Sequence, residues 1–361
     1  MPYLGEVYGN PSSIHHVGRR ARSLLDDARD RVARVWHCKP SEVIFTSGGT
    51  ESNNLAILGT ARQLQSKGRH IVTSLVEHHA VLHPCEYLRR HEGFEVTYLQ
   101  TDTHGHVKVS DVAGALRPDT TLVSVMAANN EIGTVQPVAA IGALCRERGV
   151  LFHTDAVQCF GKESFTAIDQ FQADLVSCCA HKFHGPKGAG ALFIRSPLQP
   201  DPIIFGGGHE NERRAGTENL PAIIGFAAAT ERFVRTPVFS PMPLRAKTAR
   251  ILTLLDSLSD LGVCFRGSRT GRLVNTIAFT VDGADSLTLL AALDLEGICA
   301  SSGSACSAGS LEPSHVMLAI GAGVRASNAL VRFSLGRETT DEEIAHVEQV
   351  LPGIITRARG D

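Results

Sequence analysis

Short apolar runs that alternate with amphipathic stretches are the feature that most restricts how this chain can fold. The runs are rich in Val, Ile, Leu and Phe and are mostly continuous rather than alternating with polar residues, which is typical of strands buried on both faces of a largely parallel sheet. They cover residues 42–46, 70–75, 95–99, 121–126, 150–153, 173–178 and 190–194. We therefore predict a mainly parallel sheet of about seven strands.

The stretches between these runs have helical periodicity. Apolar side chains recur on one face in residues 21–35, 54–65 and 137–146. Strand–helix alternation predicts an α/β fold, and ligands of such folds bind at the carboxyl ends of the strands.

The composition changes near residues 235–243, where three prolines fall within seven residues and predict a break in regular structure. We expect a large domain at residues 1–235 and a smaller α+β domain at residues 236–361. The second part predicts helices at 244–258, 286–295 and from 341 onward, strands at 275–281 and 330–335, and a Gly/Ser-rich loop at 301–310.

Charge and cysteine content narrow the class of protein. A formal net charge of −2 gives no reason to expect nucleic acid or an anionic membrane as a partner. No apolar run approaches the roughly 20 residues of a membrane span, and the first residues lack a signal-peptide pattern, so the cytoplasm is the expected location. The nine cysteines have no spacing that predicts a metal site or a secreted disulfide framework.

Three weak signals occur in a fixed order. The segment TSGGTESN at residues 46–53 follows a strand and starts a helix, which suits a phosphate. Asp155 ends a strand, where a buried carboxylate needs a partner such as a protonated pyridine nitrogen. Lys182 follows a later strand and could form a Schiff base. Each signal alone has a simpler explanation: an ordinary turn, a helix cap and a solvated lysine, respectively. Their order along the chain indicates a pyridoxal 5'-phosphate (PLP) enzyme.

A fourth signal is Cys306, which lies in the run SSGSACSAGSLEP at residues 301–313. Small residues have little to pack against, so we expect a mobile loop and an accessible thiol that can act as a nucleophile. Cys299 ends an apolar stretch and is expected in the core.

With these motifs the chain resembles the cysteine desulfurases of the NifS/IscS type, within the class V aminotransferases. The resemblance runs from YGNPS at residues 8–12 to RFSLGR at residues 332–337, and includes NNEIG at 129–133, HK at 181–182, GPKG at 185–188 and RRAGTEN at 213–219. It implies a fold-type I PLP-dependent transferase that acts as a homodimer.

The resemblance also implies roles for matching residues. Lys182 would hold PLP as a Schiff base and later move a proton at the substrate Cα. Asp155 would pair with the pyridine nitrogen, and His78, rather than His79, would stack on the ring. The residues expected around the phosphate are Gly49, Thr50, His181 and Thr217, the last from the partner subunit, and those expected at the phenolic oxygen are Asn130 and Gln158.

Substrate handling completes the implied reaction. Arg332 would grip the carboxylate of L-cysteine with its bidentate guanidinium. Cys306 would take the substrate sulfur as a persulfide, leaving L-alanine, and would pass the sulfur to an acceptor protein such as an iron–sulfur scaffold.

Two features depart from the family pattern. Cys179 occupies a position where a serine usually bonds the phosphate, and a thiol is a poorer donor. Relatives also carry an N-terminal stretch with an Asp-Asn-Ala-Thr-Thr-like motif, and Met1 comes after the expected place of that motif. The alternatives to a desulfurase are a selenocysteine lyase and a truncated, inactive protein of this family that only binds partners.

Overall fold

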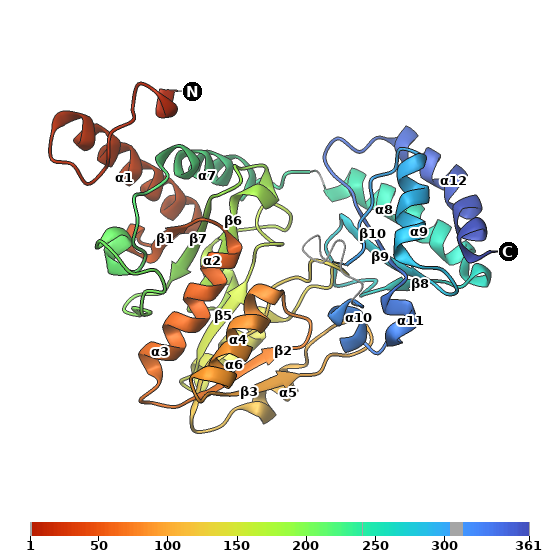
Figure 1. The fold of residues 1–361 in the computed structure, drawn as a ribbon, viewed down its shortest axis with the longest axis horizontal. Helices are drawn as coiled ribbons and strands as arrows, with labels where there is room; N and C mark the ends of the chain where they lie inside the picture. Colours follow the sequence, from red (N-terminus) through yellow and green to blue (C-terminus); the bar gives the residue numbers. More distant parts are fainter. Residues whose placement is uncertain (1, 240, 304–312, 361) are drawn as a thin grey trace.

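The computed structural model describes residues 2–239, 241–303 and 313–360. Within them, seven strands form a large sheet in the order β1-β7-β6-β5-β4-β2-β3, and three form a small sheet in the order β10-β9-β8. The two sheets lie at opposite sides of the molecule, as do the chain termini (Figure 1). The strands are β1 (Val43–Thr46), β2 (His70–Ser74), β3 (Glu95–Leu99), β4 (Thr120–Ser124), β5 (Leu151–Asp155), β6 (Leu175–Cys179), β7 (Gly190–Ile194), β8 (Val263–Arg266), β9 (Thr276–Val281) and β10 (Leu330–Ser334).

The large sheet confirms the predicted α/β class and the mainly parallel arrangement. Only β7 runs against its neighbours β1 and β6, while the other pairings, from β6 through β5, β4 and β2 to β3, are parallel. The order of the strands brings the carboxyl ends of β4, β5 and β6 side by side. This edge of the sheet is where the ligand was expected.

Adjacent residues of each strand face opposite layers of helices. Phe45, Val72 and Val123 belong to the core cluster that contains residues of the helices α1 and α7, and their neighbours Ile44, Ile71 and Leu122 belong to the cluster that contains residues of α3 and α4. Burial on both faces explains the continuous apolar runs. The helices are α1 (His16–Trp36), α2 (Gly49–Asn54), α3 (Thr60–Leu64), α4 (His79–His91), α5 (Val109–Ala115), α6 (Val138–Glu147), α7 (Leu220–Phe233), α8 (Pro241–Ser257), α9 (Ser286–Leu295), α10 (His315–Ala319), α11 (Gly323–Ser327) and α12 (Asp341–Arg359). None of the described helices is long and apolar enough to cross a membrane.

The small sheet has a buried cluster of its own, to which α8, α9 and α12 contribute Leu255, Leu289 and Leu351. The prolines near residue 240 were expected to exclude regular structure. This expectation is wrong for Pro241 and Pro243, because α8 begins at Pro241. Proline is tolerated in the first turn of a helix, where its missing N–H would have no intrahelical partner.

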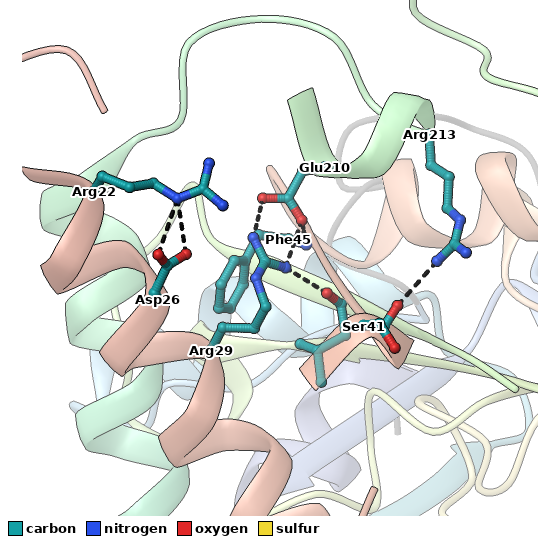
Figure 2. Close-up of polar contacts among 8 residues, drawn as sticks. Arg22, Asp26, Arg29, Ser41, Phe45, Glu210 and Arg213 are labelled. Atoms are coloured by element: carbon teal, nitrogen blue, oxygen red, sulfur yellow. Dashed lines mark hydrogen bonds and ion pairs between the residues drawn. The ribbon is translucent and has the colours of Figure 1, made fainter. Parts of the chain in front are cut away.

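A buried carboxylate fixes the segment that leads into the motif RRAGTEN. Glu210 accepts from Arg29 at 2.6 and 2.8 Å and from the backbone N–H of Phe45 at 2.9 Å (Figure 2). Glu210, Asn211 and Glu212 all have left-handed φ values, of 50°, 55° and 65°. Such a run is costly for residues other than glycine. The bonds of Glu210 to α1 and β1 therefore hold this turn in place.

Candidate active site

A cavity of about 370 Å³ lies at the carboxyl ends of the large-sheet strands and reaches the small sheet. The residues that line it are Gly49, Thr50, Asn53, His78, Met126, Ala128, Asn130, Asp155, Val157, Gln158, Lys162, Cys179, His181, Lys182, Asn275, Thr276, Arg332 and Ser334. Two predicted residues are not among them. Thr217 is exposed and does not line the cavity of its own chain, and Cys306 lies outside the described residues.

Asp155 is the last residue of β5 and is 6% exposed. It accepts from Asn53 Nδ2 at 2.6 Å and from the backbone N–H of Val157 at 3.0 Å. Among the described residues, no lysine or arginine forms an ion pair with it. A buried carboxylate that has only neutral donors can still accept a cationic partner.

The start of α2 forms one end of the cavity. A Cβ on Gly49 would lie 2.8 Å from Cγ2 of Val157, so only glycine allows the helix to begin this close to the segment after β5. The neighbouring Cys179 Sγ lies 2.9 Å from His181 Nδ1. Burial raises the pKa of the Cys179 thiol, although the backbone N–H groups of Gly49 and His181 oppose the shift. Burial, followed by the charges of Lys182 and Lys187, lowers the pKa of His181.

His78 caps α4. Its Nδ1 accepts from the backbone N–H of Ala80 at 3.0 Å. Because Nδ1 acts as an acceptor in this bond, the neutral ring carries its proton on Nε2. The cap thus fixes both the position of the imidazole in the cavity wall and its tautomer.

Arg332 reaches the cavity from β10. Its Nη1 donates to the carbonyl of Asn130 at 2.6 Å, which joins the two sheets across the site. Its Nε has no partner among the described residues. Burial lowers the pKa of Arg332, and the carboxyl of Glu131 opposes that shift. The guanidinium therefore keeps donors for an anion.

The backbone of Arg332 pairs with Ser301 in an isolated bridge, with N–O distances of 2.6 and 3.1 Å. Ser301 opens the run that contains Cys306. Cys299, expected in the core, is exposed: its neighbours Ile298 and Ala300 pack against the small-domain cluster, and Cys299 between them faces outward.

The structure also adds site residues to those that the sequence predicted. Asn53 belonged to the phosphate motif, but nothing in its sequence context indicated a bond to Asp155. Lys162 follows Gln158 by four residues, and outside a helix this spacing does not predict that the two side chains meet. Thr276 and Ser334 come from β9 and β10 of the small sheet, and the sequence gives no indication of which strand ends of the two sheets meet.

Comparisons with known proteins agree with this geometry. Residues 1–347 match the family described as Aminotransferase class-V. A "Cysteine desulfurase IscS" of Dictyoglomus turgidum is 45% identical over 99% of this chain and 90% of its own length. A solved structure of a "NIFS-LIKE PROTEIN" superposes with a TM-score of 0.88 at 34% identity, over 99% of this chain and 94% of that one. A second, described as SspA in complex with cysteine, has a TM-score of 0.80 at 34% identity, over 94% of each chain.

The chain therefore belongs to the class V aminotransferase family, and within it to the family of the IscS-type cysteine desulfurases. PLP is the cofactor of these enzymes. The residues present fit that group. The described hydrogen bonds that Asp155 accepts come from neutral donors only, which leaves its charge for a pyridine N–H. Lys182 supplies a primary amine, and His181 with the start of α2 supplies donors for a phosphate.

Proposed function

We propose that the chain is a PLP-dependent cysteine desulfurase, which converts L-cysteine to L-alanine and passes the sulfur through Cys306 to an acceptor protein. The observation that carries this proposal is that one cavity gathers Lys182, Asp155, His78 and Arg332 from four separate elements. The relatives named as cysteine desulfurases and the neighbour solved with cysteine support the choice of substrate.

Each residue has a defined task in this reaction. Arg332 binds the substrate carboxylate, and the Lys182 amine removes and returns the proton at Cα. PLP, when bound, withdraws electrons from Cα through its ring. The Cys306 thiolate forms an S–S bond as the substrate C–S bond breaks. The electron pair of the C–S bond remains on the substrate carbon, which gains a proton, and the sulfur is oxidised to the sulfane level.

The test is alanine and sulfide release from L-cysteine in the presence of a thiol reductant, which returns the persulfide sulfur as sulfide. We expect alanine from the wild type and none from Cys306→Ala. Cofactor-loaded protein that gives no alanine from cysteine but does so from selenocysteine would favour the lyase. A chain that neither takes up PLP nor forms alanine would favour the partner-binding alternative.

We also propose a homodimer in which Thr217 of each chain completes the site of the other. Its exposure away from its own cavity supports this arrangement, as do the apolar side chains of Tyr8, Ile14 and Phe205, which are 81%, 89% and 82% exposed. Light scattering would give the mass. Mixing a Lys182→Ala chain with a Thr217→Ala chain should restore one complete site in the mixed dimer.

Three further proposals follow from the same assignment. The acceptor is a protein of iron–sulfur cluster assembly, as the family resemblance implies. The protein acts in the cytoplasm, a reducing compartment that suits the described cysteines, none of which pairs with another described cysteine. The boundary between the two domains lies between residues 235 and 236, and the two separate buried clusters support it. Val238, Phe239 and Leu244, which follow this boundary, pack in the cluster of the large domain.

A further inference from the structure

The cavity contains a second lysine, and packing holds it close to the first. Lys162 lines the same space as Lys182. Gly161, with φ of 72°, precedes Lys162, and a Cβ on it would lie 2.4 Å from the Cβ of Phe183, the residue after Lys182. The two lysine-bearing segments are therefore in direct contact at adjacent positions.

The turn that carries Lys162 is well packed. Backbone bonds from Cys159 to Ala156 at 2.8 Å and from Lys162 to Cys159 at 3.0 Å close two successive turns after β5. Phe160, 1% exposed, lies between Trp36 and Phe165, with ring centroids 5.3 Å from each. This packing determines the direction in which the side chain of Lys162 leaves the turn.

Lys162 Nζ donates to the side-chain oxygen of Gln158. An ammonium group donates hydrogen bonds and accepts none, so the amide of Gln158 must present its oxygen to Lys162. Its nitrogen, with two donor hydrogens, is then left for the cavity that Gln158 lines. Without Lys162 the amide could turn over and offer an acceptor instead.

Charges from several elements act on Lys162. Lys182 and Arg332 lie opposite it on the 3₁₀ turn Ala180–Phe183 and on β10, and Cys159 and Glu163 lie on its own segment. Burial first, and then the charge of Lys182, lowers the pKa of Lys162 to about 8. The bond to Gln158 is therefore charge-assisted at neutral pH.

We propose that Lys162 is a positioning residue that holds Gln158 with its amide nitrogen toward the cofactor, so that it donates to the anionic phenolic oxygen of the PLP ring. The inference rests on the proposed function, because it concerns the same site and its cofactor.

The test is a double-mutant cycle of wild type, Lys162→Met, Gln158→Ala and the double variant. PLP affinity is measured by absorbance titration of the apo chains, and the pH midpoint of the visible band is measured on the loaded ones. We expect each single variant to bind PLP about tenfold more weakly, the loss of one charge-assisted hydrogen bond. The double variant should bind no more weakly than Gln158→Ala alone, and Lys162→Arg should retain most of the affinity.

Lys67→Met is the matched control, since Lys67 is an exposed lysine just after α3 that does not line the cavity, and its replacement should change neither the PLP affinity nor the pH midpoint. If Lys162→Met does not fold, Lys162→Gln takes its place in the cycle, with a smaller loss of about threefold. Losses that simply multiply in the double variant would overturn the inference, as would single variants that match the wild type. A wild type that takes up no PLP would overturn the proposed function as well.

Discussion

The side-chain amide of Asn53 donates to Oδ2 of Asp155 across 2.6 Å, and so ties α2 to the carboxyl end of β5. The helix that begins at the cavity and the buried carboxylate of Asp155 are thus parts of one bonded unit. The single oxygen of the Asn53 amide, Oδ1, is buried and has no partner among the described residues.

Replacing Asn53 with leucine should loosen that unit. Leucine has a similar size but no donor, so the Asp155 carboxylate would lose one of its two described hydrogen bonds. We expect the free energy of unfolding to fall by about 1–2 kcal/mol and PLP to bind about tenfold more weakly. Urea unfolding of the apo chain and absorbance titration check the two effects. Unchanged PLP affinity would show that Asn53 does not orient Asp155.

Glu210→Gln should destabilise the chain through Arg29. The side chains of Arg29 and Glu210 are 13% and 1% exposed, so removing the negative charge leaves a largely buried guanidinium unpaired. We expect a loss of about 3 kcal/mol in urea unfolding. The control is Glu212→Gln, an exposed glutamate in the same left-handed run, which should change stability by less than about 0.5 kcal/mol. Equal effects of the two variants would contradict the anchoring role.

Glu77 should give stability a specific pH dependence. Burial raises the pKa of its carboxyl to about 8 in the folded chain, although Met126 N–H and Ser74 Oγ donate to it. The pKa of an unfolded glutamate is about 4.3. Between these values the folded state holds a proton that the unfolded state has released, so the free energy of unfolding falls as pH rises, by at most about 1.4 kcal/mol per pH unit.

Glu77→Gln should remove this contribution because glutamine stays neutral. The difference in stability between variant and wild type should therefore grow in favour of the variant from pH 5 to pH 8. Urea unfolding of both chains at intervals of one pH unit measures it. A difference that is constant with pH would mean that Glu77 is charged in the folded chain.

Cys179→Ser should strengthen cofactor binding. A buried thiol with a raised pKa is a weak donor, whereas a hydroxyl in the same place can donate fully to a phosphate oxygen. We expect PLP to bind about three- to tenfold more tightly by absorbance titration. The adjacent Cys178→Ser is the control: Cys178 is fully buried and does not line the cavity, so this change should only destabilise the fold. Weaker binding by Cys179→Ser would contradict the prediction.

The sequence predicted the large-sheet strands to within two residues, because strands buried on both faces must be apolar throughout. It missed β8, an edge strand whose Cys264 is exposed, since half-exposed strands lack a continuous run. It missed α4, whose histidines and Pro84 hide the helical periodicity, and α7, whose continuous apolar composition has no clear period. The reversed direction of β7 has no signature, because a buried antiparallel strand is as apolar as its parallel neighbours.

The site divides in the same way. Motifs located Asp155, Lys182 and Gly49 because strand ends and glycine turns have recognisable sequences. Asn53 and Lys162 act through partners that only the folded chain brings within reach. The thiol of Cys306 and the partner contact of Thr217 stay predictions.

The bond from Arg332 Nη1 to the Asn130 carbonyl has a consequence for how such a protein can change over time. One end lies on β10 of the small sheet, the other in the segment after β4 of the large one. The guanidinium of Arg332 is thus oriented by a backbone group from the opposite half of the chain. Because every residue type supplies a backbone carbonyl, substitution at position 130 leaves this acceptor in place, and only a change in the path of the segment after β4 would turn Arg332 away.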